Sequence, residues 1–325
     1  MSDYRLVARR FGGPEVIEAE PLGDGPVPPG QVRVRHRAIG VNFIDTYHRS
    51  GLYPQNLPAS LGVEAAGVVE SVGAGVEGFA PGARVAYSNA VPGAYATRID
   101  IDPAQLVALP DDIDDETAAA VLLKGLTVQT LVTACARMEA GQTALVHSAA
   151  GGVGRLMVQW LTAIGVRVIA HAGTDDKAAI ARGLGAETAL HGPFATLAEE
   201  VRRANGGKGV DTVFDGVGAA SWEASLDCLR PRGLMISFGN ASGPVPPASP
   251  LELARRGSLF LTRPRVYDYL TTRSDLDAAA TELFGLVRSG RLLVEIGLRL
   301  PLEKAAEAHR ALEGRRTTGS IVLFP

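Results

Sequence analysis

Residues 143–154 of the chain read TALVHSAAGGVG, an apolar run followed directly by a turn of small residues. Thr143–Ser148 has the composition of a buried strand, and Gly154–Ile164 has the pattern of a helix. Small residues between a strand and a helix let the backbone approach a pyrophosphate, whose charge is met by free N–H groups at the helix N-terminus. The stretch therefore predicts a dinucleotide-binding turn. A helix-packing turn that binds nothing is the alternative.

Glycines at three spaced positions are typical of such turns, and this turn carries two of them. Gly151 and Gly154 take the second and third positions, while Ala149 takes the first. This degenerate version of the pattern is weak by itself, but strand, turn and helix follow one another in the required order.

The chain continues to alternate strand-like and helical runs as far as residue 261. The strand-like runs are Thr143–Ser148, Val166–Ala170, Thr188–Leu190, Val210–Asp215, Leu234–Phe238 and Ser258–Leu261, and the helical runs are Gly154–Ile164, Lys177–Leu184, Thr196–Asn205 and Ser221–Leu229. Buried apolar strands that alternate with helices indicate a parallel sheet covered on both faces. Right-handed crossovers then make it a doubly wound α/β domain.

The residues before about 120 have a different pattern, with short strands and closely spaced turns. Gln31–Ala38 alternates apolar and charged residues, as a half-buried strand does, and Gly62–Val72 and Arg84–Tyr87 are further strand candidates. This part predicts a compact β-rich domain. Glu116–Met138 then reads as one or two helices, interrupted near Gly125.

The pattern changes again after Pro264. Ser274 and Asp277 resemble a capping box, which predicts a helix from there to about Ser289. The remaining expected elements are a strand at Leu292–Ile296, a helix near Leu302–Leu312 and a strand at Ser320–Leu323.

Length and composition limit the classes of function. A chain of 325 residues exceeds the usual size of one domain and predicts two. With 32 Lys+Arg against 35 Asp+Glu the net charge is −3, which argues against nucleic acid as a partner. The polar start Met1–Arg10 lacks the apolar core of a secretion signal, and charged residues interrupt the longest apolar stretches. We expect a cytoplasmic protein with no membrane partner.

The choice of nicotinamide cofactor depends on the end of the strand after the glycine turn. An NAD-specific site usually carries an acid there, about 20 residues beyond the turn. This chain has Gly173 and Thr174, with Lys177 three residues further on, which suits a 2′-phosphate and predicts NADPH. Asp175 or Asp176 could replace the missing acid, but we expect both to cap the following helix.

Metal-binding and nucleophile motifs are absent from the sequence. The six histidines form no H-x-x-H or H-E-x-x-H pattern, and Cys135 and Cys228 cannot make a four-thiolate zinc site, so no metal is expected. The candidate reactive groups are Asn42, Asp45, Tyr47 and Tyr53, which cluster in a loop-rich segment. Taken by residue type alone, these four are more often turn and surface residues than a site.

Several short motifs together resemble the bacterial NADPH:quinone oxidoreductases, zinc-free and zeta-crystallin-like members of the medium-chain dehydrogenase/reductase superfamily. The resemblance runs nearly end to end, as far as Thr262–Pro264 and Arg315. Its motifs are VNFIDTY at 41–47, SGLYP at 50–54, KGLT at 124–127, AAGGVG at 149–154, Asp215, Val217–Gly218 and SFGN at 237–240.

The resemblance implies a GroES-like catalytic domain built from residues 1–124 and 265–325. It places a Rossmann NADPH-binding domain at 125–264, with a cleft where the two join. Zinc relatives carry Cys and His ligands where this chain has Asn42 and Val63.

The resemblance also implies the residues of the cofactor groove. These are Asn42, Phe43, Ile44, Asp45, Thr46 and Tyr47, with Thr127, at the nicotinamide; Gly151, Gly152 and Val153 at the pyrophosphate; Gly173, Thr174 and Lys177 at the 2′-phosphate; and Val217, Gly218, Phe238, Gly239, Asn240, Arg263 and Arg315 along the groove. Relatives often have Tyr where this chain has Gly192, and Ser where it has Gly216. Both departures predict weaker NADPH binding.

The implied activity is NADPH-dependent reduction of a quinone, with Tyr47 or Tyr53 orienting the quinone oxygen or donating a proton. Both one-electron and two-electron reduction stay open. The alternatives are reduction of an activated alkene (an enone or enoyl thioester) and a non-catalytic, crystallin-like protein that binds NADPH or RNA. The resemblance further implies a homodimer in which the edge strand Ser258–Thr262 pairs across a two-fold axis.

Overall fold

The computed structural model describes residues 3–88 and 91–325, and the chain forms two compact units. Unit 1 comprises Met1–Lys124, Thr271–Arg288 and Val294–Pro325, and unit 2 comprises Gly125–Leu270 and Ser289–Leu293. Short 3₁₀ turns connect some of the elements, at Pro14–Val16, Pro103–Gln105, Val266–Asp268 and Leu302–Lys304.

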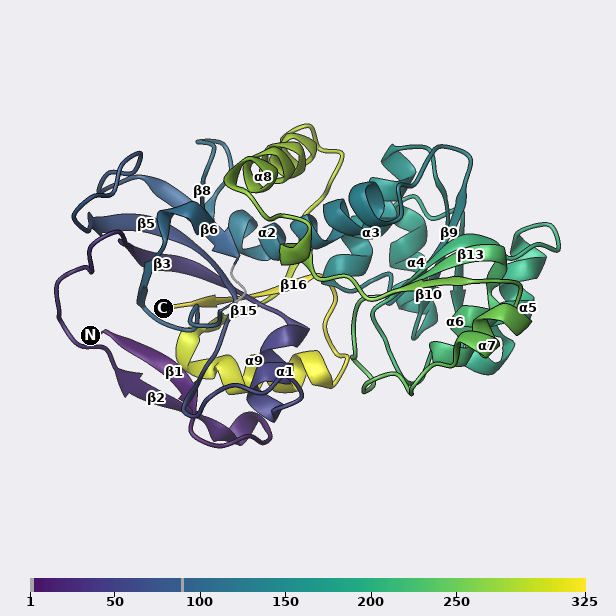
Figure 1. The fold of residues 1–325 in the computed structure, drawn as a ribbon, viewed down its shortest axis with the longest axis horizontal. Coiled ribbons are helices and arrows are strands. Elements are labelled where there is room, and N and C mark those ends of the chain that lie inside the picture. The colour runs from purple at the N-terminus through teal and green to yellow at the C-terminus, as the bar shows by residue number, and fades with distance from the viewer. Residues whose placement is uncertain (1–2, 89–90) are drawn as a thin grey trace. The chain divides into compact units, whose positions relative to one another are not determined.

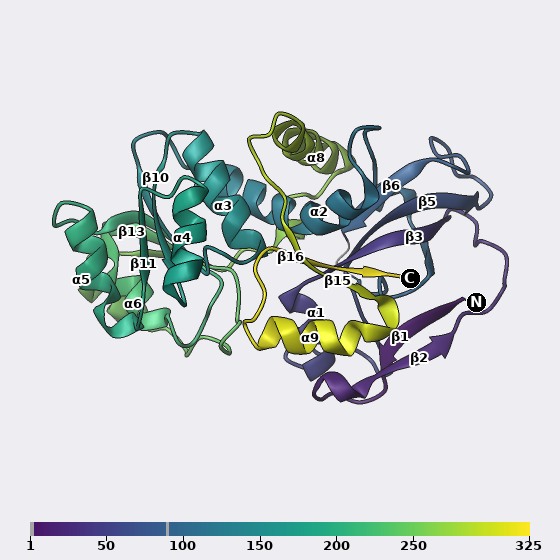
Figure 2. The same ribbon diagram turned by 180° about the vertical axis from the view of Figure 1, so that it is seen from behind.

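Unit 2 is a doubly wound α/β structure, as the sequence predicts (Figure 1). Its parallel sheet runs in the order β11 (Thr188–His191), β10 (Arg167–Ala172), β9 (Thr143–His147), β12 (Val210–Asp215), β13 (Leu229–Ser237) and β14 (Phe260–Thr262). The helices are α3 (Gly152–Ala163), α4 (Asp175–Gly183), α5 (Phe194–Ala204), α6 (Trp222–Asp227) and α7 (Pro250–Arg255). Helices α3 and α4 cover one face of the sheet, and α5 and α6 the other (Figures 1 and 2).

The strand order places β9 in the middle of the sheet. The next strands along the chain, β10 and β11, are added one after the other on one side of β9. The strand that follows them, β12, pairs with the other side of β9. The order of connection therefore reverses between β9 and β12, and the ligands of such sheets bind at the carboxyl ends of the strands beside this switch point. The glycine turn directly follows β9, so it lies at the switch point.

The helix expected near Gly125 is continuous there, and the predicted interruption is wrong. Helix α2 (Asp115–Gln129) passes through Gly125 and continues as a π-helical segment, Thr130–Cys135. An interior glycine costs only about 1 kcal/mol relative to alanine, and the fully buried neighbours Leu122 and Leu126 outweigh that cost by packing. By length and composition Asp115–Cys135 could cross a membrane, but 72% of its apolar window is buried, as in the core helix of a globular protein.

Unit 1 is β-rich, with two sheets. A three-stranded sheet has the order β2 (Ile17–Pro21), β1 (Tyr4–Ala8) and β4 (Ala59–Ser60). A seven-stranded sheet has the order β15 (Ile296–Pro301), β16 (Ser320–Phe324), β3 (Val32–Val41), β5 (Glu64–Val72), β6 (Arg84–Ser88) and β8 (Leu106–Ala108), while β7 (Arg98–Ile101) also pairs with β3. The unit's helices besides the start of α2 are α1 (Phe43–Ser50), α8 (Arg273–Arg288) and α9 (Ala305–Glu313).

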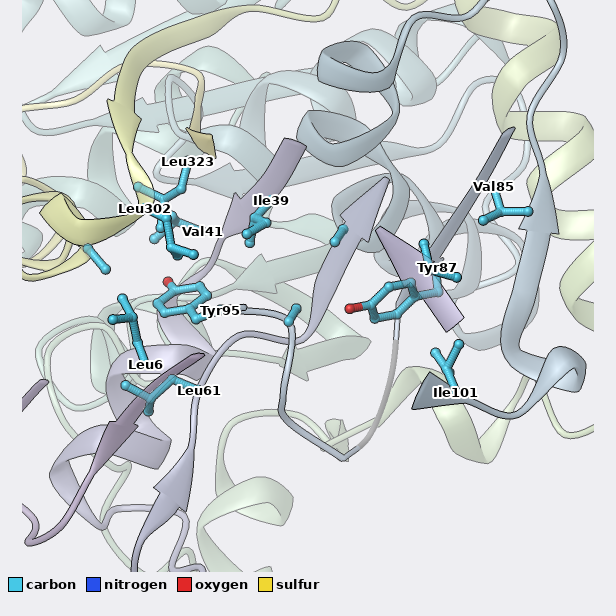
Figure 3. Close-up of a cluster of buried hydrophobic side chains, with 14 of the residues drawn as sticks. Leu6, Ile39, Val41, Leu61, Val85, Tyr87, Tyr95, Ile101, Leu302 and Leu323 are labelled. Atoms are coloured by element: carbon cyan, nitrogen blue, oxygen red, sulfur yellow. The ribbon is translucent and has the colours of Figure 1, made fainter. Parts of the chain in front are cut away.

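Strand β3 organises the larger sheet. The predicted alternation along it is confirmed, because Val32 and Val34 are fully buried while Arg33 pairs with Asp100 at 2.7 Å near the surface. The C-terminal strand β16 pairs antiparallel with β3, so the C-terminal segment joins the larger sheet of the N-terminal part of the chain. Figure 3 shows the core packed against this sheet, where Tyr95 lies beside Leu6, Leu61 and Val41.

Two predictions for the C-terminal segment are wrong in position. The capping box of α8 is formed by Thr272 and Asp275, each of whose backbone N–H groups bonds to the other's side chain at 2.9 and 3.1 Å. The strand expected at Leu292–Ile296 begins only at Ile296. Its first residues cannot join a ladder, since the N–H and C=O of Leu293 bond instead to the Gln159 side chain, at 2.7 and 3.2 Å.

Candidate functional site

The predicted groove residues of unit 2 follow the carboxyl ends of neighbouring strands in its sheet. Gly151–Val153 follow β9, Gly173–Thr174 follow β10, Val217–Gly218 follow β12, Phe238–Asn240 follow β13, and Arg263 follows β14. Because the strands are parallel, all these turns lie along one edge of the sheet. The structure thus brings together residues up to about 110 positions apart in the sequence.

The glycine turn packs as tightly as its composition suggests. A Cβ on Gly154 would lie 2.2 Å from the Ser148 carbonyl oxygen and 2.8 Å from the Ala149 Cα, so only glycine fits there. Helix α3 begins at Gly152, two residues earlier than expected, with Gly151 as its N-cap. The first N–H groups of a helix have no intrahelical partner, and here they belong to Gly152, Val153 and Gly154 at the strand end.

A buried carboxylate shapes the turn after β12. Asp215 is 1% exposed, and its Oδ1 accepts the backbone N–H groups of Val217 and Gly218 at 2.7 and 3.2 Å. Its Oδ2 accepts the hydroxyls of Ser221 and Ser225 at 2.6 and 2.7 Å. Asp215 therefore fixes the backbone of the two predicted groove residues. Asp215 belongs to one of the motifs shared with the family, but no role was predicted for it from the sequence.

The turns after β12 and β13 pack closely against each other. A Cβ on Gly239 would lie 2.3 Å from the Gly216 carbonyl oxygen. Arg263 spans the end of β13, since its Nη1 donates to the carbonyl oxygens of Ser237 at 2.8 Å and Gly239 at 3.1 Å. These contacts give the Phe238–Asn240 segment a fixed backbone at the edge of the sheet.

The turn after β10 carries the residues expected at a 2′-phosphate. Thr174 is the N-cap of α4, and its Oγ1 accepts the backbone N–H of Lys177 at 3.4 Å. The expectation that Asp175 or Asp176 caps this helix is therefore wrong, and both acids lie in its first turn. Asp175 pairs with Arg182 at 3.0 Å, which offsets its charge, and it lies 3.6 Å from the His191 ring.

The two departures from the family pattern have structural consequences. Gly192 has a φ of +124°, a conformation that other residues rarely adopt, so a tyrosine would be strained on this backbone although space is open around it. A Cβ on Gly216 would lie 3.0 Å from the Phe238 ring, so a serine there requires the ring to shift.

In unit 1, the segment read as loop-rich is a helix. Asn42 precedes α1 as its N-cap, and its backbone N–H donates to Asp45 Oδ2 at 2.8 Å. Gly51 ends the helix with a φ of +82°. An Asn with an acid three residues later and a glycine nine residues later is a helix signal, but the segment was predicted to be loop-rich because Asn, Asp and Gly are also common in loops.

The two candidate tyrosines lie together at this helix. The ring centroids of Tyr47 and Tyr53 are 5.2 Å apart in an edge-on arrangement, and the Tyr53 N–H donates to the Tyr47 carbonyl at 3.1 Å. Tyr47 is 8% exposed, and Tyr53 is half-buried. Phe43 lies 6.3 Å from the Tyr47 ring, which completes a small aromatic group.

A buried ion pair lies behind Asn42. The Glu64 carboxylate is fully buried and accepts the Asn42 side-chain amide at 2.7 Å, the Lys124 ammonium at 2.8 Å and the Leu123 N–H at 2.8 Å. A Cβ on Gly40 would lie 2.3 Å from Glu64 Oε1, so the carboxylate occupies the space that a larger residue would take. Neither Glu64 nor Lys124 was a predicted site residue, because no motif or spacing in the sequence links the two residues.

Asp45 is the other buried acid of this region. It is fully buried, and desolvation raises its pKa from 3.8 to about 7, against hydrogen bonds from the Asn42 N–H and the Tyr95 hydroxyl that lower it. The Tyr95 hydroxyl donates to Asp45 Oδ2 at 3.1 Å.

The remaining predicted residues lie elsewhere in their units. Thr127 is half-buried on α2, and Arg315 is exposed after α9 with a φ of +54°. Within the described residues, 3–88 and 91–325, no three side chains of the ligand types His, Cys, Asp and Glu gather as a metal site. Val63, at the position of a zinc ligand in zinc relatives, is a buried apolar residue that cannot ligate a metal.

A β-rich unit closed by the C-terminal strands, together with a doubly wound sheet and a glycine turn, is the architecture of the medium-chain dehydrogenases/reductases. Residues 28–111 match the family described as "Alcohol dehydrogenase GroES-like domain", and residues 152–284 match "Zinc-binding dehydrogenase".

Known relatives resemble the chain over its full length. A quinone oxidoreductase of Pseudomonas aeruginosa is 48% identical over 322 residues, 99% of both chains. A 2-haloacrylate reductase of Burkholderia sp is 42% identical over 98% of both. The crystal structure of Escherichia coli quinone oxidoreductase complexed with NADPH is 43% identical, with a TM-score of 0.95 over 99% of this chain and 100% of that one. The chain belongs to the quinone oxidoreductase family of the medium-chain dehydrogenase/reductase superfamily.

Proposed function

We propose that this chain is an NADPH-dependent oxidoreductase that reduces quinones. The observation that carries the proposal is the row of turns along the carboxyl edge of the unit 2 sheet, at its switch point beside β9. A relative that is named quinone oxidoreductase at 48% identity, and another whose crystal structure contains NADPH, support the same activity. Unit 2 is then the cofactor-binding domain, and unit 1 the catalytic domain.

The residues of the turns fit the phosphates of the cofactor. Gly152 and Val153 place first-turn N–H groups of α3 at the pyrophosphate, Gly151 contacts it as the N-cap residue, and Gly154 lets the backbone come close. We propose that the cofactor also contacts Val217, Gly218, Phe238, Gly239, Asn240, Arg263 and Thr127 of unit 2, and Asn42, Phe43, Ile44, Asp45, Thr46, Tyr47 and Arg315 of unit 1.

The turn after β10 favours NADPH over NADH. The Thr174 hydroxyl retains its proton for donation while it caps α4, and Lys177, on the first turn of that helix, supplies a positive charge. Gly173 leaves the strand end open, without the carboxylate that would hold a 2′-hydroxyl and repel a 2′-phosphate.

When bound, NADPH supplies a hydride to the substrate. Tyr47 and Tyr53 orient the quinone through their hydroxyls, since their rings meet edge-on at 5.2 Å and brace each other. Asn42 is held by Glu64 at 2.7 Å and fixes the start of α1, which carries Asp45 and Tyr47.

Reduction of an activated alkene is a second candidate, because a 2-haloacrylate reductase is 42% identical over nearly the whole chain. The deciding experiment follows NADPH and NADH oxidation with a quinone, an enone, an enoyl thioester and 2-chloroacrylate. We expect the highest kcat/KM for the quinone with NADPH. Preference for an alkene would replace quinone reduction by the second candidate, and the absence of turnover with NADPH would refute both.

We also propose that the protein is a cytoplasmic homodimer. Strand β14 (Phe260–Thr262) is an edge strand of its sheet, with Phe260 61% and Leu261 37% exposed, and a second copy pairing with it would cover this apolar edge. Light scattering at micromolar concentration should give twice the chain mass of 34.0 kDa, and a monomer would contradict the proposal.

A further inference from the structure

A chain of buried hydrogen bonds links helix α9 to the start of helix α1 through the core of unit 1. Arg49 Nη1 lies 3.0 Å from His309 Nδ1, His309 Nε2 lies 3.0 Å from the Tyr95 hydroxyl, and that hydroxyl lies 3.1 Å from Asp45 Oδ2. The exposed fraction is 3% for Arg49 and zero for the other three residues. At its outer end Arg49 is held by Glu313, at 2.6 Å.

The chemistry of the four groups fixes the direction of donation. A guanidinium can only donate, so His309 Nδ1 must be the acceptor, and the proton of the neutral ring is on Nε2. Nε2–H then donates to the Tyr95 oxygen, and the Tyr95 hydroxyl proton is directed to Asp45. Burial and the nearby Arg49 charge lower the pKa of His309 to about 3, which keeps the ring neutral. Burial raises the pKa of Tyr95 well above 10, which keeps its hydroxyl a donor.

Both donors that reach Asp45 approach the same oxygen. Oδ2 accepts the Asn42 N–H at 2.8 Å and the Tyr95 hydroxyl at 3.1 Å. Oδ1 is buried, and no donor in the described part of the chain reaches it. A negative charge on such a carboxyl group leaves one buried oxygen unpaired, whereas a proton on Oδ1 removes the charge and leaves both bonds to Oδ2 intact.

We propose that Asp45 stores a proton on Oδ1 for the reduction of the substrate, and that Arg49, His309 and Tyr95 are positioning residues that select this oxygen. The inference rests on the proposed function for the use of the proton, but not for its location. No other role assigned to unit 1 uses His309, Tyr95 or Arg49.

The charged groups around Asp45 come from several elements. Glu64 on β5 disfavours the carboxylate and Lys124 on α2 favours it, while the two are paired to each other at 2.8 Å. Desolvation is the largest influence, and the pKa of Asp45 is raised to about 7. The proton is therefore present below neutral pH and is lost as the pH rises through that value.

The proton completes a balanced reaction. Addition of one hydride to a quinone gives a hydroquinone monoanion. Asp45 is fully buried, so its proton reaches the substrate through intervening hydroxyl groups or water. The O–H bond of Asp45 breaks, each relaying group gains one proton and passes on another, and a new O–H bond forms on the substrate oxygen to give the neutral hydroquinone. The Asp45 carboxylate takes a proton from water before the next turnover. The nicotinamide is the reductant, and no other co-reactant is required.

The location of the proton can be tested without cofactor or substrate. Infrared difference spectra of the full chain, titrated from about pH 5 to about pH 9, should show a protonated carboxyl band that Asp45→Asn removes and whose midpoint is about 7. Tyr95→Phe removes a bond that favours the carboxylate, so the midpoint should rise by about one unit. Absence of an Asp45 band, or a midpoint near the ordinary value of about 4, would overturn the inference.

Tyr87→Phe is the matched control, because the Tyr87 hydroxyl also bonds a buried histidine, His36, at 2.9 Å in the same core (Figure 3). It should leave the midpoint unchanged, and an equal shift would show that Tyr95 acts only through general packing. In turnover, kcat/KM for the quinone should fall about tenfold per pH unit above the same midpoint and move with Tyr95→Phe. If kcat/KM does not change with pH across this range, the Asp45 proton is not used in the reduction. A midpoint of about 7 for Asp45 without quinone turnover would refute the proposed function and still support the location of the proton on Asp45.

Discussion

Replacing Glu64 by glutamine should destabilise unit 1 far more than the loss of one surface charge. The carboxylate is fully buried and accepts three hydrogen bonds, from Asn42, Leu123 and Lys124. Glutamine retains one acceptor oxygen but turns an amide N–H₂ group toward these donors, and it leaves the buried Lys124 charge unpaired. Removing one partner of a buried ion pair costs about 3–5 kcal/mol, and the retained acceptor favours the lower end. At about 2–4 °C per kcal/mol, the Tm should fall by roughly 6–12 °C.

The assay is thermal unfolding followed by circular dichroism, with Glu116→Gln as the control. Glu116 pairs with Arg299 at a similar distance, 2.8 Å, but its side chain is 40% exposed, so its loss should cost at most about 1 kcal/mol. Adding Lys124→Met to Glu64→Gln removes the unpaired charge and should recover much of the loss. If Glu64→Gln lowers the Tm no more than Glu116→Gln does, the assignment of an uncompensated buried charge is wrong.

Three further predictions concern the proposed groove and the tyrosines. Gly154→Ala places a methyl group 2.2 Å from the Ser148 carbonyl oxygen, so the turn must move, and calorimetry should show at least a tenfold weaker NADPH affinity. Lys177→Ala should weaken NADPH binding about tenfold or more and leave NADH binding unchanged, and equal losses for both cofactors would refute its role at the 2′-phosphate. Tyr47→Phe and Tyr53→Phe should each lower kcat/KM for the quinone about tenfold, whereas full activity in both would remove their proposed orienting role.

The parts of the fold that the sequence predicted are those set by local pattern. Apolar runs between helical runs identified the parallel sheet, because a strand buried on both faces has no polar alternation to obscure it. The Gly154 contact with Ser148 was foreseeable, since close packing of helix and strand permits no side chain at that position. The N-cap of α4 was misplaced by one or two residues, because Thr174, Asp175 and Asp176 are all good capping residues and their order does not decide between them.

The site of unit 1 was less predictable, because its contacts join residues far apart in the sequence. Tyr95 and His309 are separated by 214 positions and meet at 3.0 Å, and Glu64 and Lys124 by 60 and meet at 2.8 Å. Neither pair has a spacing that a helix or strand period would reveal. Asp45 was chosen as a candidate by its motif, but its environment follows from the pairing of strands and the position of α9.

Three buried carboxylates show how donors, more than burial, decide the role of an acid. Asp215 and Glu64 each receive donors on both oxygens, and these hydrogen bonds hold backbone and side chains in place. Asp45 is equally buried but receives donors on Oδ2 alone. Its Oδ1 therefore either is part of a charged carboxylate without a hydrogen-bond partner or carries a proton. Because burial strongly disfavours the unpaired charge, Asp45 is the acid of this group whose geometry suits proton exchange near neutral pH.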